Sequence, residues 1–269
     1  MNSASEAWRL RYGTTAPLDI TPTLAGLLQH RSVRQYLDRP VSDDSLLRAV
    51  AAAQSASTSS NLQLWSVIAV RDPERKLELA RLAGNQRHVR DAPLLLLWVA
   101  DLSRLQRMGE ALQQPTEGRE YLEGFVLASI DAALAAQNAA VSLESEGLGL
   151  VYIGGMRNQP EAVARVLDLP SGAMVVFGMC VGHPDPEAAA VIKPRLSPSV
   201  VLHHETYASA DEAAGIAEYE QRAAAFQQAQ GRETPPWSRQ AVARMADGAA
   251  LTGRDRLREA LAAMGFPLR

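Results

Sequence analysis

Six consecutive apolar residues, 94–99 (LLLLWV), constrain the fold of this chain more than any other stretch. Alternate side chains of a strand point to opposite faces of its sheet. A strand that is apolar at every position is therefore buried on both faces, as in sheets that helices cover from both sides. The run predicts a strand inside such a covered sheet.

Three other β-rich runs predict the rest of the sheet, at residues 64–70, 148–153 and 174–181. Helical patterns lie between the strands and after them, which favours an α+β class with a central sheet flanked by helices. The pattern predicts an irregular segment at residues 1–20, a mobile excursion at 103–120 and an extended segment at 200–207. Asn158 is expected to cap a helix that runs to Leu167.

The longest helical stretch covers residues 125–146 and is rich in alanine and leucine, with Gly147 as its C-cap. Its main polar interruptions are Asp131, Gln137, Asn138 and Glu144. A helix that is apolar nearly all round is buried on most sides. Two placements stay open: a central helix of the domain, or a helix at a subunit interface.

The composition fits a globular chain with one domain, or with one domain and an extension: it has 269 residues, of which 47% are hydrophobic. A net charge of −3 argues against a general nucleic-acid binder. The single cysteine, Cys180, lies in an apolar run and is expected in the core. No apolar signal segment is visible near Glu6 and Trp8, and the longest apolar run is too short to span a bilayer. We therefore expect a soluble cytoplasmic protein with no membrane partner.

Residues 30–34 (HRSVR) place two guanidiniums, an imidazole and a hydroxyl within five positions. Arg31 and Arg34 are three residues apart and can reach one anion from a helical turn. Arginine suits phosphate because its planar fork of N–H donors matches two oxygens. The alternative is a solvated basic turn without a ligand.

Three other segments carry polar groups of the same kind: a hydroxyl-rich loop at 57–63, the strand end at 152–155, and Lys193-Pro194-Arg195. Taken singly, each has a plainer interpretation, as a flexible linker, a turn or a surface charge pair. No phosphate-binding P-loop, dinucleotide fingerprint or nucleophile elbow is present. The adjacent His203 and His204 do not suit a metal, and no metal site is predicted.

Together and in this order, the four segments resemble the nitroreductase family of FMN-dependent oxidoreductases, in its oxygen-insensitive, flavin-reductase-like branch. The resemblance runs from about Thr23 to Gly265. It implies a nitroreductase-like α+β fold with a four- to five-stranded mixed sheet, in a domain-swapped homodimer whose FMN sites lie at the subunit interface. The helix at 125–146 would then lie at that interface. The implied organisation is an N-terminal extension (1–20), an FMN-binding core (21–204) and a C-terminal helical extension that wraps around the partner subunit (205–269).

The resemblance also implies roles for individual residues. Phosphate would be held by His30, Arg31, Ser32 and Arg195, and the flavin N1 and C2 carbonyl would lie near Arg34 and Lys193. The hydroxyl loop would supply Ser57, Thr58, Ser59 and Gln63 along the ring or ribityl chain, Gln86 would reach the pyrimidine edge, and the backbone of Tyr152, Ile153, Gly154 and Gly155 would approach the ring. A fixed cation near N1 stabilises the negative charge of a reduced flavin.

The implied activity is two-electron, ping-pong transfer of hydride from NADPH or NADH through FMN to small acceptors such as nitroaromatics, quinones or flavins. Hydride transfer needs no side-chain acid or base, so no catalytic residue is predicted. Two alternatives stay open: a non-catalytic flavin carrier or sensor with the same pocket, and, if the resemblance is set aside, a phosphate-binding regulatory module.

The sequence departs from this branch in the segment implied to bind the nicotinamide donor. In the branch, an arginine before a tryptophan holds the 2′-phosphate of NADPH. In the shorter segment here, Gln230 falls at the arginine's place, and glutamine brings no charge. Arg232 could substitute, with Arg239 as a second candidate, although Glu233 weakens the attraction. We therefore expect NADPH to be accepted with a smaller preference over NADH.

Overall fold

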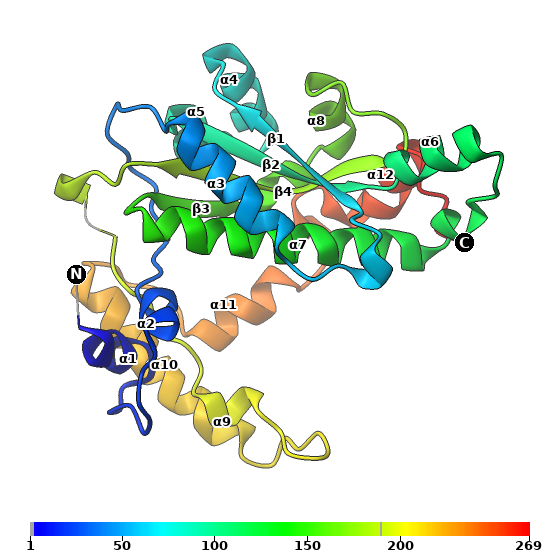
Figure 1. Cartoon of the computed structure of the whole chain (residues 1–269). Coiled ribbons are helices and arrows are strands. Elements are labelled where there is room, and N and C mark those ends of the chain that lie inside the picture. Colours follow the sequence, from blue (N-terminus) through cyan, green and yellow to red (C-terminus); the bar gives the residue numbers. More distant parts are fainter. Residues whose placement is uncertain (1–2, 189) are drawn as a thin grey trace. The chain divides into compact units, whose positions relative to one another are not determined.

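The computed structural model describes residues 3–188 and 190–269, which belong to two compact units (Figure 1). The first, which we call the sheet unit, contains residues 32–190 and 252–269. The second, which we call the helical unit, contains residues 1–31 and 191–251. Residues 1, 2 and 189 lie outside the described residues.

The sheet unit is built on four strands, β1 (Trp65–Val70), β2 (Leu94–Asp101), β3 (Gly149–Ile153) and β4 (Ala173–Gly182). They pair in the order β1-β2-β4-β3, and every pairing of these strands is antiparallel. This confirms the α+β class with a helix-flanked sheet. The expectation of a mixed sheet is wrong for these four strands; the one parallel pairing among the described residues is an isolated bridge between Ser32 and Leu150, outside the sheet.

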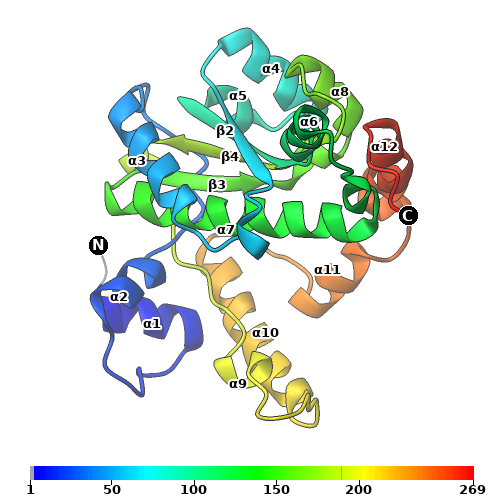
Figure 2. The same cartoon turned by 45° about the vertical axis from the view of Figure 1, so that its right-hand side comes forward.

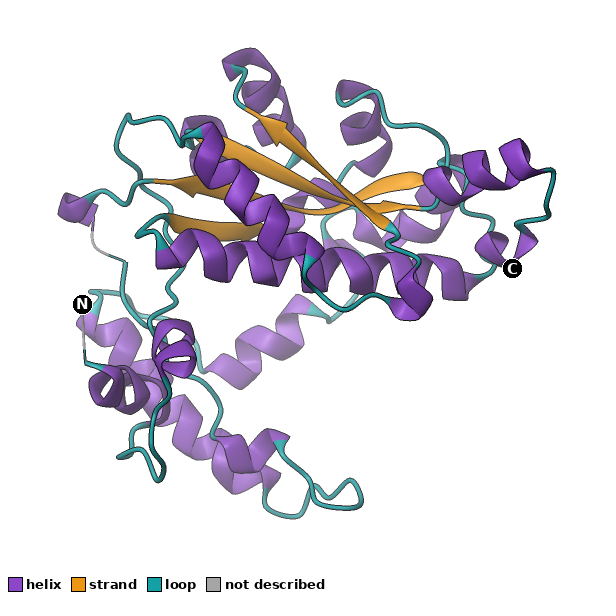
Figure 3. Ribbon diagram, viewed as in Figure 1, coloured by secondary structure: helices purple, strands orange, loops and turns teal. Residues whose placement is uncertain are grey.

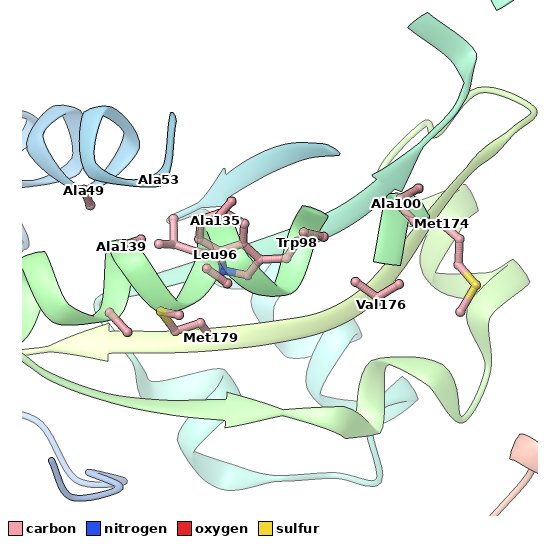
Figure 4. Close-up of a cluster of buried hydrophobic side chains, with 14 of the residues drawn as sticks. Ala49, Ala53, Leu96, Trp98, Ala100, Ala135, Ala139, Met174, Val176 and Met179 are labelled. Carbon is pink, nitrogen blue, oxygen red and sulfur yellow. The ribbon is translucent and has the colours of Figure 1, made fainter. Parts of the chain in front are cut away.

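Strand β2 is buried at all eight positions, as its apolar sequence predicts. Its alternate side chains enter two different cores. Leu96 and Trp98 pack on one face with helices α3 (Asp43–Gln54) and α7 (Leu122–Ser145). Leu95 and Leu97 pack on the other face with α4 (Pro73–Leu82) and α8 (Pro160–Val166). Figure 2 shows these helices on opposite faces of the sheet, and Figure 4 shows the first cluster in detail.

Helix α7 (Leu122–Ser145) is the central helix of the first core. Its buried face is made mostly of alanines, including Ala128, Ala132 and Ala135, and these small side chains let the helix lie close to β2 and α3. Length and composition alone would let α7 cross a bilayer, but a core helix passes the same test. Its burial against the sheet accounts for the apolar sequence.

The other helices of the sheet unit surround this framework (Figure 3). Two of them begin at residue types that favour helix starts: the Ser42 side chain caps α3, and Pro73 is the first residue of α4. The remaining elements are α3 (Asp43–Gln54), α4 (Pro73–Leu82), α5 (Arg87–Asp91), α6 (Ser103–Leu112), α8 (Pro160–Val166) and α12 (Leu257–Ala263), with short 3₁₀ turns at Ser59–Asn61, Glu117–Glu120, Gly154–Arg157, Pro186–Ala188 and Arg254–Arg256.

The helical unit has a small core of its own. Ala7 and Trp8 are buried with Leu28 and Ile192, so the N-terminal helix packs against two segments far apart in the chain. Its elements are α1 (Ala4–Tyr12), α2 (Pro22–Leu28), α9 (Pro198–Val201), α10 (Glu212–Ala229), α11 (Trp237–Arg244) and a 3₁₀ turn at Ala249–Leu251.

Three segments differ from the sequence predictions. Residues 1–20 contain helix α1, which Ser3 caps by accepting a hydrogen bond from the Glu6 N–H at 3.1 Å. Residues 103–120 contain α6, whose first N–H groups are bound by the Asp101 carboxylate. Residues 200–207 are not extended throughout, since α9 ends within them. In each case a polar cap or a single turn decides the structure where apolar periodicity is weak.

Candidate functional site

The segment that follows His30 and Arg31 lies along the edge of β3. The N–H of Val33 donates to the Leu150 carbonyl at 2.9 Å, next to the parallel bridge formed by Ser32. A Cβ added at Gly149 would lie 2.6 Å from a methyl group of Val33, so only glycine allows this close approach. Ser32 is thereby fixed to the same strand that ends in the predicted glycine pair.

That glycine pair, Gly154-Gly155, follows β3 and meets Gln86. The Gln86 side-chain amide donates to the Ala83 carbonyl at 2.7 Å. A Cβ added at Gly155 would lie 2.5 Å from that carbonyl oxygen and 2.7 Å from Gln86 Nε2. The neighbouring Ile153 is 2% exposed, and its side chain packs in the second core.

Two guanidiniums that sequence reasoning missed lie near Gly154. An added Cβ there would be 3.6 Å from Arg157 Nη2 and 3.8 Å from Arg254 Nη1. Burial lowers the pKa of Arg157, whose guanidinium donates to the Val176 carbonyl. Asn158 does not cap α8 as expected, because its side-chain oxygen accepts from Arg254 Nε at 2.9 Å. The end of β3 is therefore close to two positively charged side chains, which no local sequence motif predicts.

Arg34 is exposed, and its charge acts on His88 of helix α5, which follows Gln86. Burial is the main cause that lowers the pKa of His88, and the charge of Arg34 lowers it further, while Asp91 opposes the shift. Two predicted segments of the sheet unit therefore flank β3: Ser32 lies beside Leu150 near the start of the strand, and Gln86 lies beside Gly155 just after its end.

The hydroxyl-rich loop is held by a buried acid, Asp131 of α7. Its carboxylate accepts from the Thr58 hydroxyl at 2.5 Å, the Leu64 N–H at 3.0 Å and the Ser59 N–H at 3.3 Å. The Thr58 oxygen also accepts from the N–H of Gln63 at 2.9 Å. Since its single hydroxyl hydrogen is bound to Asp131, Thr58 organises the loop, and Ser57, Ser59 and the Gln63 side chain are the exposed groups.

In the helical unit, an extended segment displays Lys193 and Arg195. Ile192 and Pro194 are buried while Lys193 and Arg195 are exposed, so the two cations share one side of the segment. The Arg195 N–H donates to the Arg11 carbonyl at 2.8 Å. This places Arg195 in the same unit as His30 and Arg31, the other predicted phosphate ligands.

A cavity of about 380 Å³ lies beside these cations. Lys193 and Arg195 line it together with Tyr219, Gln227 and Trp237. The side-chain oxygen of Gln227 is buried and accepts no hydrogen bond from the described residues. The rings of Tyr219 and Trp237 meet edge to face at 5.1 Å. The cavity thus combines cations, an aromatic wall and an unused acceptor.

The two predicted nicotinamide-donor residues lie near the end of α10. Gln230 is its C-cap, and Arg232 follows two residues later, with its N–H donating to the Gln227 carbonyl at 3.0 Å. Both side chains are exposed, and the lining of the cavity includes Gln227 instead of either. Gln227 is a further residue that the sequence alone did not single out.

Cys180 lies in the second core and is fully buried, which confirms the expectation that it is a core residue. Burial raises the pKa of its thiol to about 12, so the thiolate that a nucleophile needs is scarce at neutral pH. Within residues 3–188 and 190–269, no group of three histidine, cysteine or acidic side chains is arranged to hold a metal ion.

Comparison with known proteins agrees with this fold. The model of the nitroreductase family matches residues 27–183, and that of the nitroreductase family C-terminal domain matches residues 193–269. The chain belongs to the nitroreductase family.

Individual relatives carry more specific names. An FMN reductase (NADPH) from Bacillus subtilis is 42% identical over 186 residues, which are 69% of this chain and 74% of the relative. The solved structure of NfrA2 from B. megaterium has a TM-score of 0.86 and 34% identity, over 93% of this chain and 99% of that one. The NADPH:FMN oxidoreductase from Vibrio harveyi, solved with NAD⁺, has a TM-score of 0.80 and 33% identity, over 93% and 100% of the two chains.

Proposed function

We propose that this chain is an FMN-dependent NAD(P)H oxidoreductase of the flavin-reductase type. The observation that carries the proposal is the placement of the predicted segments along β3 and just after its end. Ser32 forms a β-bridge with Leu150 of β3, the Gln86 side chain lies beside Gly155, and the guanidiniums of Arg157 and Arg254 lie beside Gly154. The resemblance assigns these segments to FMN, and the names of the relatives, an FMN reductase and an NADPH:FMN oxidoreductase, support the same cofactor and donor.

The residues fit FMN by their chemistry. A phosphate ester carries about −1.5 to −2 charges at neutral pH and accepts hydrogen bonds only. His30, Arg31 and Arg195 of the helical unit, with Ser32, form a set of cationic and hydroxyl donors of the kind that phosphate needs. Backbone at the glycine pair, together with Gln86, would contact the flat ring, and the exposed hydroxyls of the loop at 57–63 would meet its polar edge or the ribityl chain.

Bound FMN supplies the redox chemistry by accepting hydride from NAD(P)H and passing two electrons to an acceptor. The residues of this chain would position the flavin and stabilise its reduced form. Arg34 and Lys193 would favour negative charge at the N1 and C2 carbonyl side, and no side chain need move a proton. We propose ping-pong exchange of donor and acceptor, with nitroaromatics, quinones and flavins as the acceptor class.

We further propose a homodimer in the cytoplasm, in which a second copy covers the exposed apolar stripe of α7. Leu122, Val126, Ile130 and Leu134 recur every four residues on this helix and are 39–53% exposed. A stripe of this kind on a helix whose other face is core is typical of an interface. The division into an extension (1–20), a core (21–204) and a C-terminal extension (205–269) remains part of this proposal.

The test is reduction under nitrogen. The purified protein is expected to be yellow, and stoichiometric NADPH or NADH should bleach the flavin absorbance rapidly, after which a quinone restores it. A yellow protein that neither nucleotide bleaches would instead indicate a flavin carrier or sensor. A colourless protein that does not bind added FMN would contradict the assignment of the cofactor.

A further inference from the structure

We propose that Arg11 of helix α1 is a positioning residue for the FMN phosphate, holding the His30–Arg31 segment and the Arg195 segment in one frame. The inference rests on the proposed function, because it assumes that these residues bind the phosphate. It adds a role for the N-terminal helix, which lies ahead of the residues that the two family models match, 27–183 and 193–269.

The hydrogen bonds of Arg11 reach both segments. Its Nε donates to the Leu28 carbonyl at 3.1 Å and its Nη2 to the His30 carbonyl at 2.8 Å. Its own carbonyl accepts from the Arg195 N–H at 2.8 Å. A single residue thus fixes the peptide before Arg31 from one side and the backbone of Arg195 from the other.

The side chain of Arg11 is buried, which makes its hydrogen bonds important for stability. Its side chain is only 6% exposed, although arginine is rarely buried. A buried guanidinium is stable only when its donors are satisfied, and the rigid fork of arginine suits two carbonyls at once. Since no phosphate is needed to explain its position, Arg11 can orient the segment before any cofactor arrives.

The apolar contacts of α1 act on the same two segments. Trp8 packs in one cluster with Leu28, which ends α2, and with Ile192, which precedes Lys193. On the far side of Arg195, the Arg222 guanidinium of α10 donates to the Arg195 carbonyl at 3.3 Å. Arg195 is therefore held through both its N–H and its carbonyl, and α1 supplies one of these two supports.

A phosphate-specific effect follows from this arrangement. The hydrogen bonds of Arg11 to His30 and Arg195 support two residues that are assigned to the phosphate. Losing Arg11 should weaken binding of FMN but leave riboflavin, which lacks the phosphate, unaffected. A general loss of structure would lower both affinities together.

The experiment measures dissociation constants of FMN and riboflavin for the full-length apoprotein by quenching of flavin fluorescence. The variants are Arg11→Met, Arg11→Lys and, as a positive control, Arg31→Ala. The matched control is Arg9→Met on the same helix, whose side chain is 64% exposed and pairs only locally with Glu6. Arg11→Met should weaken FMN binding about tenfold or more, equivalent to about 1.4 kcal/mol, with riboflavin unchanged and Arg9→Met at the wild-type value.

Arg11→Lys keeps the positive charge but not the planar set of N–H donors, so we expect an intermediate loss of FMN affinity with riboflavin affinity unchanged. If circular dichroism shows that Arg11→Met is unfolded, Arg11→Lys is the variant that tests the proposal. The proposal is overturned if a folded Arg11 variant binds FMN as Arg9→Met does, or if FMN and riboflavin weaken equally. Should Arg11 fail in this way while Arg31→Ala still loses FMN, the assigned function stands without the role of Arg11. A wild-type protein that binds neither flavin overturns both.

Discussion

The Asp131 carboxylate of α7 accepts the hydroxyl hydrogen of Thr58 across 2.5 Å, and this contact ties a strained loop to the central helix. Ser60, Asn61 and Gln63 of that loop have φ angles of 48°, 55° and 53°, in the left-handed region that non-glycine residues rarely adopt. Such conformations persist only where surrounding contacts enforce them, and they gather at functional sites. Asp131 accepts from the N–H groups of Ser59 and Leu64, which flank these three residues.

We expect the effects of substitutions at Asp131 and Thr58 on the free energy of unfolding to be strongly coupled. Asp131→Asn and Thr58→Val are each expected to destabilise the fold by about 1–3 kcal/mol, because hydrogen bonds to a buried charge are involved. In a double-mutant cycle by urea unfolding, the interaction free energy should be at least about 1 kcal/mol. Strictly additive effects would show that the two side chains do not act together.

The ion pair between Arg48 and Glu146 should make stability depend on pH. Hydrogen bonds from Arg48, at 2.8 Å, and from Ser45 lower the pKa of Glu146 to about 2 from an ordinary 4.5. A carboxyl with a lowered pKa in the folded state adds stability above the unfolded value, and this is lost as the pH falls through the folded value. Wild type should therefore exceed Glu146→Gln in unfolding free energy at pH 6.

That difference should shrink below about pH 4.5 and vanish near pH 2. Denaturant titrations of both proteins across this range provide the measurement. A difference that stays constant with pH would mean that the ionised form of Glu146 is not what stabilises the pair.

Assembly should depend on the exposed stripe of α7. Ile130 is 49% exposed on that stripe, and Ile130→Glu would bury a charge in a dimer interface, which is costly. Light scattering should then give a mass near 29.0 kDa for the variant and twice that for wild type. Leu77→Glu, on α4 at the opposite face of the sheet, is the control and should stay dimeric; a wild-type monomer that still binds FMN would refute the interface.

Lys193 should tune the flavin potential. If its ammonium stabilises negative charge at the N1 side, Lys193→Met lowers the two-electron potential by tens of millivolts, where about 30 mV corresponds to roughly 1.4 kcal/mol. Spectroelectrochemistry measures this directly. Arg165→Met on α8 removes a like charge elsewhere and should leave the potential unchanged; unchanged potentials in both Lys193→Met and Arg34→Met would remove the electrostatic role.

Donor preference should respond to charge after α10. Gln230→Arg introduces the cation that a 2′-phosphate favours, so kcat/KM for NADPH relative to NADH should rise. Arg232→Ala should lower the same ratio. If neither variant moves it, the 2′-phosphate is recognised elsewhere, and Gln227→Ala, in the cavity with Lys193 and Arg195, becomes the next variant to measure.

The sequence by itself determined the architecture of the sheet unit, because apolar periodicity is a local property. The unbroken run at 94–99 predicted a strand covered on both faces, and β2 is buried throughout. Local chemistry also determined the starts of α3 and α4, at Ser42 and Pro73. The order of the four polar segments was enough to indicate the family.

Only the tertiary structure decided which of these residues support one another. Thr58 and Asp131 lie 73 positions apart, and Arg11 reaches carbonyls 17 and 19 positions away, so no local pattern announces either contact. Arg254 and Gly154 are likewise far apart in the sequence, and no local pattern predicts that they lie side by side. Such pairs form because packing of the sheet and helices brings their backbones together, and the hydrogen bonds of buried polar groups must then be completed within the fold.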